Sequence, residues 1–366
     1  MKGKKVDRFF LIIILLLLAL GVAMFVSASL GILAKNTKTF YSVLFSQLVL
    51  GLGIGFVGMY FCSKINYKFW RRFSFLFFIG AILLTAAVFI PSLGWSHGGA
   101  ERWIQLGPIP SFQPVEFLKF AFVVYFAAWL SWAKSRVQDF RFGVLPFVIM
   151  IGIIAVVLLK QPDTKSFILI TVTGISMLFI SSVPIKYILG TILGAVFLFG
   201  ALVYFTPYLQ ERVKTFIDPA QDAKGSSYQI QQSLIALGSG GVFGRGFGQS
   251  IQKFSYLPEP QGDSIFAVLG EELGFVGVTI TIFLYLLFIL RGFYIGNRTP
   301  DAFSGLLVYG IVILITAQSF MHIASVVGVF PLTGVPLVFM SQGGTALMVY
   351  MMAIGIVLNV SKFQKN

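Results

Sequence analysis

The sequence contains little charge and almost no cysteine. Among its 366 residues, 11% are charged, 57% are hydrophobic and one is a cysteine. Soluble domains carry about 25% charged residues, so a single soluble globular fold is excluded. Cys62 lies inside an apolar run and has no second cysteine with which to form an internal disulfide. This composition indicates a protein that is embedded in a membrane.

Several chemical motifs are absent as well. The two histidines, His97 and His322, have no neighbouring histidine, cysteine or suitably spaced carboxylate, so we expect both to be structural. The sequence has no phosphate-cradling nucleotide motif, zinc-protease motif or nucleophile-elbow serine. The net charge of +14 comes mainly from bases in short blocks between apolar runs, where membrane topology and anionic lipids account for them. Nucleic acid is therefore not an expected partner.

Apolar runs of about 20 residues, the length that a bilayer-spanning helix requires, take up most of the chain. There are ten, and they cover residues 9–30, 41–62, 73–92, 114–133, 144–160, 166–183, 187–206, 264–290, 302–328 and 343–361. We therefore predict an all-α integral membrane protein with about ten transmembrane helices. Residues 1–366 are expected to form a single polytopic domain.

The distribution of basic residues predicts the orientation of the chain. If the N-terminus is cytoplasmic, the inner segments hold 16 Lys and Arg residues and the short outer loops hold five. Positive charge is enriched on the cytoplasmic side, so both termini are predicted to be cytoplasmic. Residues 207–263, between the seventh and eighth helices, then form a large external loop. Long loops cross regardless of charge, and the bases of this loop are therefore left out of the count.

Ionisable residues inside the predicted spans mark candidate sites, because each costs roughly 2.5–3.5 kcal/mol at mid-helix. Glu116 and Lys119 lie three residues apart near the outer end of the fourth span, hence on one helical face. They form either a structural ion pair or a pair that faces a polar cavity. Glu271 and Glu272 follow the start of the eighth span. Because adjacent helical residues point about 100° apart, the two cannot face one partner equally.

Polar residues also gather at the external ends of the spans. Asp263 stands where the long loop enters the eighth span, and it could either cap that helix or act as a general base. Arg102 and Trp103 suit a lipid headgroup at the membrane surface. Asp163, after Gln161-Pro162, presents an acid at a helix entry, although helix punctuation alone would explain it.

Two segments have too much glycine and proline to form regular helices. Residues 331–345 hold Pro331, Gly334, Pro336 and Gly343-Gly344, and they predict a broken passage of backbone that lines a cavity. The glycine-rich run 238–248 gives the long external loop unusual freedom. This run is either a flexible tether or part of an interface formed with its apolar and aromatic neighbours.

These stretches together resemble the SEDS family of cell-wall proteins, the group that contains FtsW, RodA and SpoVE. The resemblance covers nearly the whole chain and rests on five motifs in the family's order. They are the loop Gly99-Ala100-Glu101-Arg102-Trp103-Ile104 with Phe112-Gln113-Pro114 and Glu116; Gln161-Pro162-Asp163; the long stretch from Tyr228-Gln229-Ile230-Gln231-Gln232-Ser233 to Asp263 and Gly270-Glu271-Glu272-Leu273-Gly274; Thr333-Gly334; and Gly343-Gly344. The Gly240-Gly241 loop and the element at Thr333-Gly334 favour an FtsW-like member.

The resemblance implies an inverting glycosyltransferase of the bacterial cytoplasmic membrane, with both termini cytoplasmic, that polymerises lipid II into glycan strands at the outer face. Lipid II is the undecaprenyl-linked disaccharide peptide, and Asp263 would be the catalytic residue. The expected substrate-binding residues are Arg102, Trp103, Glu116, Lys119, Asp163, Gln229, Gln232, Ser239, Gly240, Lys253, Glu272, Ser341, Gly343 and Gly344. The expected partners are a class B penicillin-binding protein transpeptidase and other divisome or elongasome membrane proteins.

Two alternative functions and one cofactor stay open. A lipid-linked precursor transporter, or flippase, would have paired repeats with broken helices in corresponding halves, and none is visible in the sequence. A scaffold would tolerate the loss of every cavity carboxylate. No motif requires a metal, but a divalent cation, Mg²⁺ or Mn²⁺, near Asp263 stays possible.

Departures from the family pattern surround the catalytic position. The family commonly has His-Thr and Phe where this chain has Gln261-Gly262 and Ser264, and it has Gly and Asn where this chain has Lys165 and His322. Val338 and Gln342 likewise replace a usual Pro and Tyr. These changes preserve the acid and alter its expected hydrogen-bond partners.

Overall fold

The computed structural model describes residues 5–97, 100–105, 111–218 and 226–365, and helices account for most of them. The helical passages in the apolar part of the chain are α1 (Arg8–Leu33), α2 (Thr37–Leu44) with the π-helix η1 (Phe45–Gly53) and α3 (Ile54–Lys64), α4 (Tyr67–Ala86) with η2 (Ala87–Phe89), α5 (Pro114–Ala133) with η3 (Lys134–Gln138), α6 (Val144–Lys160), α7 (Thr164–Ile180), α8 (Ile185–Phe205), α12 (Ile265–Asn297), α13 (Ala302–Val326) and α14 (Gly344–Ser361).

Every predicted span lies on one of these passages. Eight passages in the described residues are long and apolar enough to cross a membrane, which confirms the all-α integral membrane fold. The other two, α6 and α7, are apolar helices of 17 residues each. Crossing by these two shorter helices, and hence the count of ten, stays a prediction.

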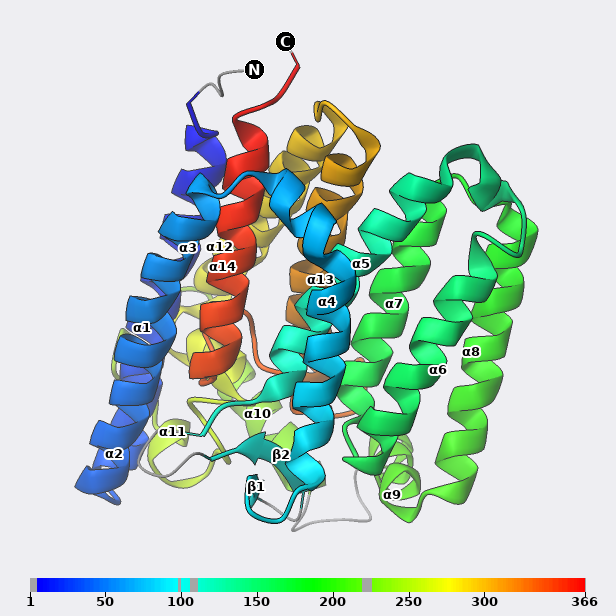
Figure 1. The fold of residues 1–366 in the computed structure, drawn as a ribbon. Coiled ribbons are helices and arrows are strands. Elements are labelled where there is room, and N and C mark those ends of the chain that lie inside the picture. The colour runs from blue at the N-terminus through cyan, green and yellow to red at the C-terminus, as the bar shows by residue number, and fades with distance from the viewer. Residues whose placement is uncertain (1–4, 98–99, 106–110, 219–225, 366) are drawn as a thin grey trace.

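The helices form a bundle with a clear inside and outside. Helix α14 packs against α3, α5 packs against α4 and α13, and α12 packs against α1 and α13. Most residues of α5, α13 and α14 are buried, whereas α8, at the edge of the bundle, buries only Ile188 (Figure 1). The exposed side chains of α8 are large and apolar, as expected for a helix that faces lipid.

Both termini lie at one end of the bundle and the loop elements lie at the other (Figure 1). The loop elements are the antiparallel hairpin of β1 (Gly94–His97) and β2 (Ala100–Ile104), α9 (Pro207–Ile217), α10 (Ser226–Ser239) and α11 (Gln252–Ser255). At the end with the termini, Asp7 caps α1 by accepting a hydrogen bond from Phe10 N, and it pairs with Arg291 of α12 at 2.7 Å. This ion pair ties the first helix to the eighth predicted span.

Residues 207–263, the predicted external loop, are folded wherever the structure describes them. Helix α10 packs against α12, and Gly240 at its end touches the carbonyl of Gly270 so closely that a Cβ could not fit. The interpretation of the glycine-rich run as a flexible tether is therefore wrong. The run packs on α12 through its glycines, whereas most of its apolar and aromatic neighbours, such as Leu234 and Tyr256, are exposed. The predicted break between the last two spans is also present, since residues 331–337 form no helix or strand.

Candidate active site

The broken segment between α13 and α14 organises the polar interior. The carbonyl groups of residues 333–336 each accept a hydrogen bond from a side chain. The donors, in order, are Arg212 at 3.3 Å, Lys165 in a very short contact, His322 Nδ1 at 2.8 Å and Gln318 at 3.0 Å. Backbone without regular structure is tolerated at membrane depth only when its polar groups are satisfied in this way. The segment is therefore held in one conformation by α7, α9 and α13.

Asp263 lies directly against this segment. A Cβ built on Gly334 would stand 2.9 Å from Asp263 Oδ2, and Gly334 has a φ of +64°, which favours glycine at this position. The helix cap of α12 is Ser264, and no side chain makes a capping hydrogen bond there. The alternative role of Asp263 as a helix cap is therefore wrong. Its carboxylate is half-buried and is not used for capping.

Two cations, Lys165 and Arg212, interact with this carboxylate, and a third, Arg102, interacts with both of them. Lys165 interacts electrostatically with Asp163, Asp263, Arg102 and Arg212. Burial lowers the pKa of Arg212, as does the neighbouring charge of Arg102, while Tyr208 and Asp263 raise it. Three positive charges face two carboxylates in this group. The group therefore keeps an excess positive charge that an anionic ligand would neutralise.

Arg102 and Asp163, both predicted site residues, lie side by side. The guanidinium of Arg102 donates to the carbonyl groups of Gln161 at 3.3 Å and of Pro162 in a very short contact. This ties the β1–β2 hairpin to the entry of α7. Asp163 is fully buried and caps α7 by accepting a hydrogen bond from Ser166 N at 3.4 Å. The predicted helix punctuation is thus present, and Arg102 approaches the same turn.

Buried polar atoms without a partner concentrate around Asp263. Within the described residues, Asp163 Oδ2, Gln261 Oε1, His322 Nε2 and Thr333 Oγ1 are buried and accept or donate no hydrogen bond to the protein. Leaving such a group unpaired costs about 1–3 kcal/mol. These four polar atoms are available to hydrogen-bond to water or to the hydroxyl groups of a ligand.

The predicted pair of Glu116 and Lys119 is confirmed. Their charged atoms lie 2.8 Å apart and both side chains are buried. Lys119 Nζ also donates to Gln318 Oε1 at 2.8 Å and faces the Tyr350 ring at 5.4 Å. Because Gln318 also donates to the carbonyl of Pro336, the pair is connected through Gln318 to the broken segment. The pair therefore helps to hold this segment in place.

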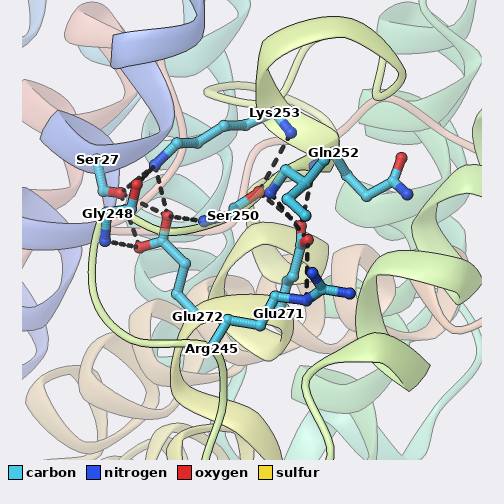
Figure 2. Close-up of polar contacts among 9 residues, drawn as sticks. Ser27, Arg245, Gly248, Ser250, Gln252, Lys253, Glu271 and Glu272 are labelled. Atoms are coloured by element: carbon cyan, nitrogen blue, oxygen red, sulfur yellow. Dashed lines mark hydrogen bonds and ion pairs between the residues drawn. The ribbon is translucent and has the colours of Figure 1, made fainter.

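Glu271 and Glu272 share Ser250 as a partner, which donates its Oγ–H to Glu271 and its N–H to Glu272, and their other partners differ. Together they anchor the loop that precedes α11 (Figure 2). Glu272 accepts hydrogen bonds from Ser27 Oγ at 2.7 Å and Gly248 N at 2.9 Å. Glu271 accepts from Ser250 Oγ at 2.5 Å and Ile251 N at 3.0 Å. The two carboxylates therefore accept hydrogen bonds from backbone N–H groups of this stretch that no helix or strand satisfies.

Lys253 belongs to this anchor. Its ammonium group donates to Glu272 Oε1 at 2.7 Å, Gly248 O at 2.8 Å and Ser27 Oγ at 3.0 Å. An ammonium group has three donors, so all of them are used within the protein. The geometry therefore favours a structural role for Lys253 and Glu272, which is to hold the loop. It disfavours the predicted contact of these two residues with substrate.

The other predicted residues fall into two groups. Gln229 donates to Ser264 Oγ at 3.1 Å, and Ser341 donates to the carbonyl of Gly262 at 2.9 Å, so both adjoin Asp263. The second group contacts other parts of the fold. Trp103 lies beside Trp95, with ring centroids 6.5 Å apart, Gln232 is half-buried on α10, and Ser239 donates to the carbonyl of Ala236. Gly240 lies against Gly270, Gly343 N donates to Gln47, and Gly344 lies against Ser46.

The sequence-based search missed Lys165, Arg212, Gln318 and Gln47. Arg212 lies in the long external segment, whose bases were left out of the topology count. Gln318 and Gln47 are uncharged, and only ionisable residues were sought inside the spans. Lys165 was noted only as a departure from the family pattern. An amide inside an apolar run was the signal available for the two glutamines, because a buried amide needs partners.

The described residues contain no group of three or more histidine, cysteine, aspartate or glutamate side chains that could hold a metal ion. The charged neighbours of Asp263 include Lys165 and Arg212, which repel a divalent cation. Hard cations such as Mg²⁺ take oxygen ligands, commonly more than one carboxylate or carbonyl. The divalent cation near Asp263 that the sequence left open stays an expectation.

Comparison with known proteins agrees with this architecture. The family described as "Cell cycle protein", which covers FtsW, RodA and SpoVE, matches residues 7–366. The chain belongs to this family. With the membrane helices, family membership makes it a multi-pass protein of the bacterial cytoplasmic membrane.

Two relatives match over almost their full length. The chain is 37% identical to the "Probable peptidoglycan glycosyltransferase FtsW" of Geobacter sp. (strain M18), covering 97% of this chain and 96% of that protein. It is also 37% identical to the "Stage V sporulation protein E" of Bacillus subtilis (strain 168), covering 98% of each. Sequence identity therefore does not assign the chain to the FtsW type over the stage V sporulation protein E type.

Two solved structures share the fold. A chain from "Structural coordination of polymerization and crosslinking by a peptidoglycan synthase complex" matches with a TM-score of 0.80 at 23% identity, covering 98% of each chain. The rod shape determining protein RodA of Thermus thermophilus matches with a TM-score of 0.71 at 24% identity, covering 99% of this chain and 98% of that chain. The arrangement of helices in Figure 1 is thus one already seen in solved structures.

Proposed function

We propose that this protein is an inverting glycosyltransferase that polymerises lipid II into peptidoglycan glycan strands at the outer face of the membrane. The observation that carries this proposal is the carboxylate of Asp263 beside Lys165 and Arg212. A carboxylate can take a proton from a sugar hydroxyl, and adjacent cations can bind a pyrophosphate. The names of the relatives support the same chemistry.

The reaction is a single displacement. The 4-hydroxyl oxygen of one sugar attacks the anomeric carbon of another, the bond from that carbon to the lipid pyrophosphate breaks, and the hydroxyl proton passes to Asp263. No covalent sugar forms on the protein, so an α-linked donor gives a β-linked product. The departing pyrophosphate gains negative charge, which Arg102, Lys165 and Arg212 stabilise by preorganised electrostatics. No step passes through a metal.

This assignment revises which of the predicted substrate-binding cations, Arg102, Lys119 and Lys253, could contact the pyrophosphate. Lys253 has used all its donors within the protein. Lys119 is buried in its pair with Glu116 and bonds to Gln318. Arg102 remains a proposed contact of the pyrophosphate, and Lys165 and Arg212 replace Lys253 and Lys119 in this role. The glutamines near Asp263, chiefly Gln229, are available for sugar hydroxyl groups.

The proposed partner is a class B penicillin-binding protein transpeptidase, together with other divisome or elongasome membrane proteins. A structurally similar chain comes from a complex described as coordinating polymerization and crosslinking. The transporter alternative is not favoured, because the named relatives are glycosyltransferases.

The test replaces the proposed base. Asp263→Asn keeps the size of the side chain and removes its basicity, so polymer formation from purified lipid II should fall by about 10²–10⁴-fold. Yield of folded protein in the membrane should not change, because Asp263 caps no helix. The control is Asp139→Asn, an exposed acid between η3 and α6. Polymerisation at the wild-type rate by Asp263→Asn would show that the base lies elsewhere, with Asp163 next to be tested.

A further inference from the structure

The second helical passage contains an unusual feature that the proposed chemistry does not yet use. Residues Phe45–Gly53 form a π-helix between α2 and α3. Such wide turns are rare, and they occur frequently at functional sites. Gln47 lies in this π-helix, and its side chain is 3% exposed. A buried amide inside an apolar passage requires partners for both of its ends.

Both ends of the Gln47 amide bind the backbone of the broken segment. Gln47 Nε2 donates to the carbonyl of Ser341 at 3.0 Å, and Gly343 N donates to Gln47 Oε1 at 2.8 Å. The side chain thus binds the carbonyl of Ser341 and the N–H of Gly343, which flank residue 342. A residue of a neighbouring β-strand would bind the same two backbone groups. The π-helix also lies close to the start of α14, since a Cβ on Gly51 would stand 3.0 Å from Gly344 Cα.

The opposite side of the same segment binds the loop that carries Asp263. Gln342 N donates to the carbonyl of Gln261 at 2.8 Å, and Ser341 Oγ donates to the carbonyl of Gly262 at 2.9 Å. These two carbonyl groups immediately precede Asp263 in the chain. Residues 341–343 are therefore a bridge, with Gln47 on one side and the backbone of the proposed base on the other.

We infer that Gln47 is a positioning residue, which sets the place of Asp263 through residues 341–343. The inference rests on the proposed function only for its kinetic consequence, since the structural link stands on hydrogen bonds alone. A displacement of about 1 Å in a reacting group can lower a rate by about 100-fold. The fold would survive the loss of Gln47, because the apolar contacts between α3 and α14 remain.

The first experiment removes the amide. In full-length Gln47→Ala, amide hydrogen exchange in residues 261–264 should rise by about tenfold, the factor expected from the loss of one or two hydrogen bonds. The turnover number for lipid II should fall by ~10–100-fold, with KM changed less than about threefold. The matched control is Thr173→Val, which removes a buried hydrogen bond from Thr173 Oγ1 to Leu169 O within α7. It should change neither quantity.

The second variant gives a pH signature that a purely structural role would not produce. In Gln47→Glu, a protonated carboxyl group can donate to Ser341 O and accept from Gly343 N, whereas an ionised one cannot donate. The activity of Gln47→Glu relative to wild type should therefore be high at acid pH and fall as pH rises through the pKa of the new carboxyl group. This variant also serves if Gln47→Ala fails to fold.

The outcomes separate this inference from the proposed function. Unchanged exchange in residues 261–264 of Gln47→Ala would overturn the inference, whether or not the protein polymerises lipid II. Faster exchange with an unchanged turnover number would overturn it too. A wild-type protein without polymerase activity would contradict the proposed function, and the exchange result would still decide the structural link.

Discussion

Arg212 shows why a single residue must be judged by its neighbours. In the sequence it is one of several bases in a long external segment. In the structure it is half-buried, donates to the carbonyl of Thr333 and interacts with Asp263. Holding a cation partly out of water beside a second cation, Arg102, is unfavourable. Such an arrangement is typical of a site that binds an anion.

The charge of Arg212 can be removed without removing its hydrogen-bonding capacity. Arg212→Gln keeps an N–H donor for the carbonyl of Thr333 and deletes the positive charge. Charge-assisted hydrogen bonds contribute about 1.5–3 kcal/mol, so kcat/KM for lipid II should fall by ~10–150-fold. Steady-state polymerisation of purified lipid II measures this loss.

Arg141→Gln is the matched control, because Arg141 is an exposed arginine on the turn between α5 and α6. The two variants should have the same folded yield. Equal kcat/KM for Arg212→Gln and Arg141→Gln would show that Arg212 does not contact the pyrophosphate.

His322 was expected to be structural, and the structure supports this with a specific role. Its Nδ1–H donates to the carbonyl of Val335, which fixes the tautomer and leaves Nε2 free of protein partners. The family commonly has asparagine at this position, and an asparagine amide can also donate to a carbonyl. The histidine therefore keeps the backbone contact and adds an acceptor near Asp263.

At the scale of elements, hydrophobic runs predicted the helices well and the external loop poorly. A helix satisfies its own backbone, so its sequence alone carries the signal. The fold of residues 226–264 depends instead on side chains from α1 and α12, chiefly Ser27, Glu271 and Glu272. Both glutamates and the glycine-rich run stood out in the sequence, but their contact could not be inferred from spacing.

The candidate site was predictable from the sequence at helix boundaries and unpredictable in the segment without regular structure. Asp263, Arg102 and Asp163 stand at helix boundaries, where a carboxylate or a guanidinium is conspicuous in an apolar chain. The donors to the carbonyl groups of residues 333–336 were not predictable, because they come from α7, α9 and α13. The path of a segment without regular structure carries no periodic signal in the sequence.

Gly244 is the sharpest test of how the glycine-rich loop packs on α12. Its φ is +80°, and a Cβ at this position would collide with the carbonyl of Glu272. Gly244→Ala should therefore lower the free energy of unfolding by ~1–3 kcal/mol, the usual cost of overpacking. The midpoint of thermal unfolding in detergent measures the change.

A nearby glycine offers a control for that substitution. Gly238 lies in α10, and a Cβ built on it meets nothing within 4 Å. Alanine is the better helix former by about 1 kcal/mol, so Gly238→Ala should leave the unfolding midpoint unchanged or raise it. Equal midpoints for the two alanine variants would mean that the loop does not pack on α12 as described.

At the scale of the whole molecule, the two ends of the bundle differ in composition and in role. The end with the termini carries the Asp7–Arg291 pair and the short basic loops. The other end gathers the hairpin, α9, α10 and α11 (Figure 1), and from these elements come Arg102, Arg212 and Gln229. The positive-inside rule predicts that the first end is cytoplasmic, and this prediction would place the candidate site outside.

This orientation can be measured with single cysteines. The only native cysteine, Cys62, is buried, and Cys62→Ala gives a background without thiols. On that background Phe243→Cys, at a side chain that is 82% exposed in the predicted external segment, should react with a membrane-impermeant maleimide on intact spheroplasts. Lys68→Cys, at an exposed position in the first turn of α4, should react only after permeabilisation. The opposite pattern would place Asp263 in the cytoplasm, on the side where glycan strands cannot join the wall, and would contradict the proposed function as well as the topology.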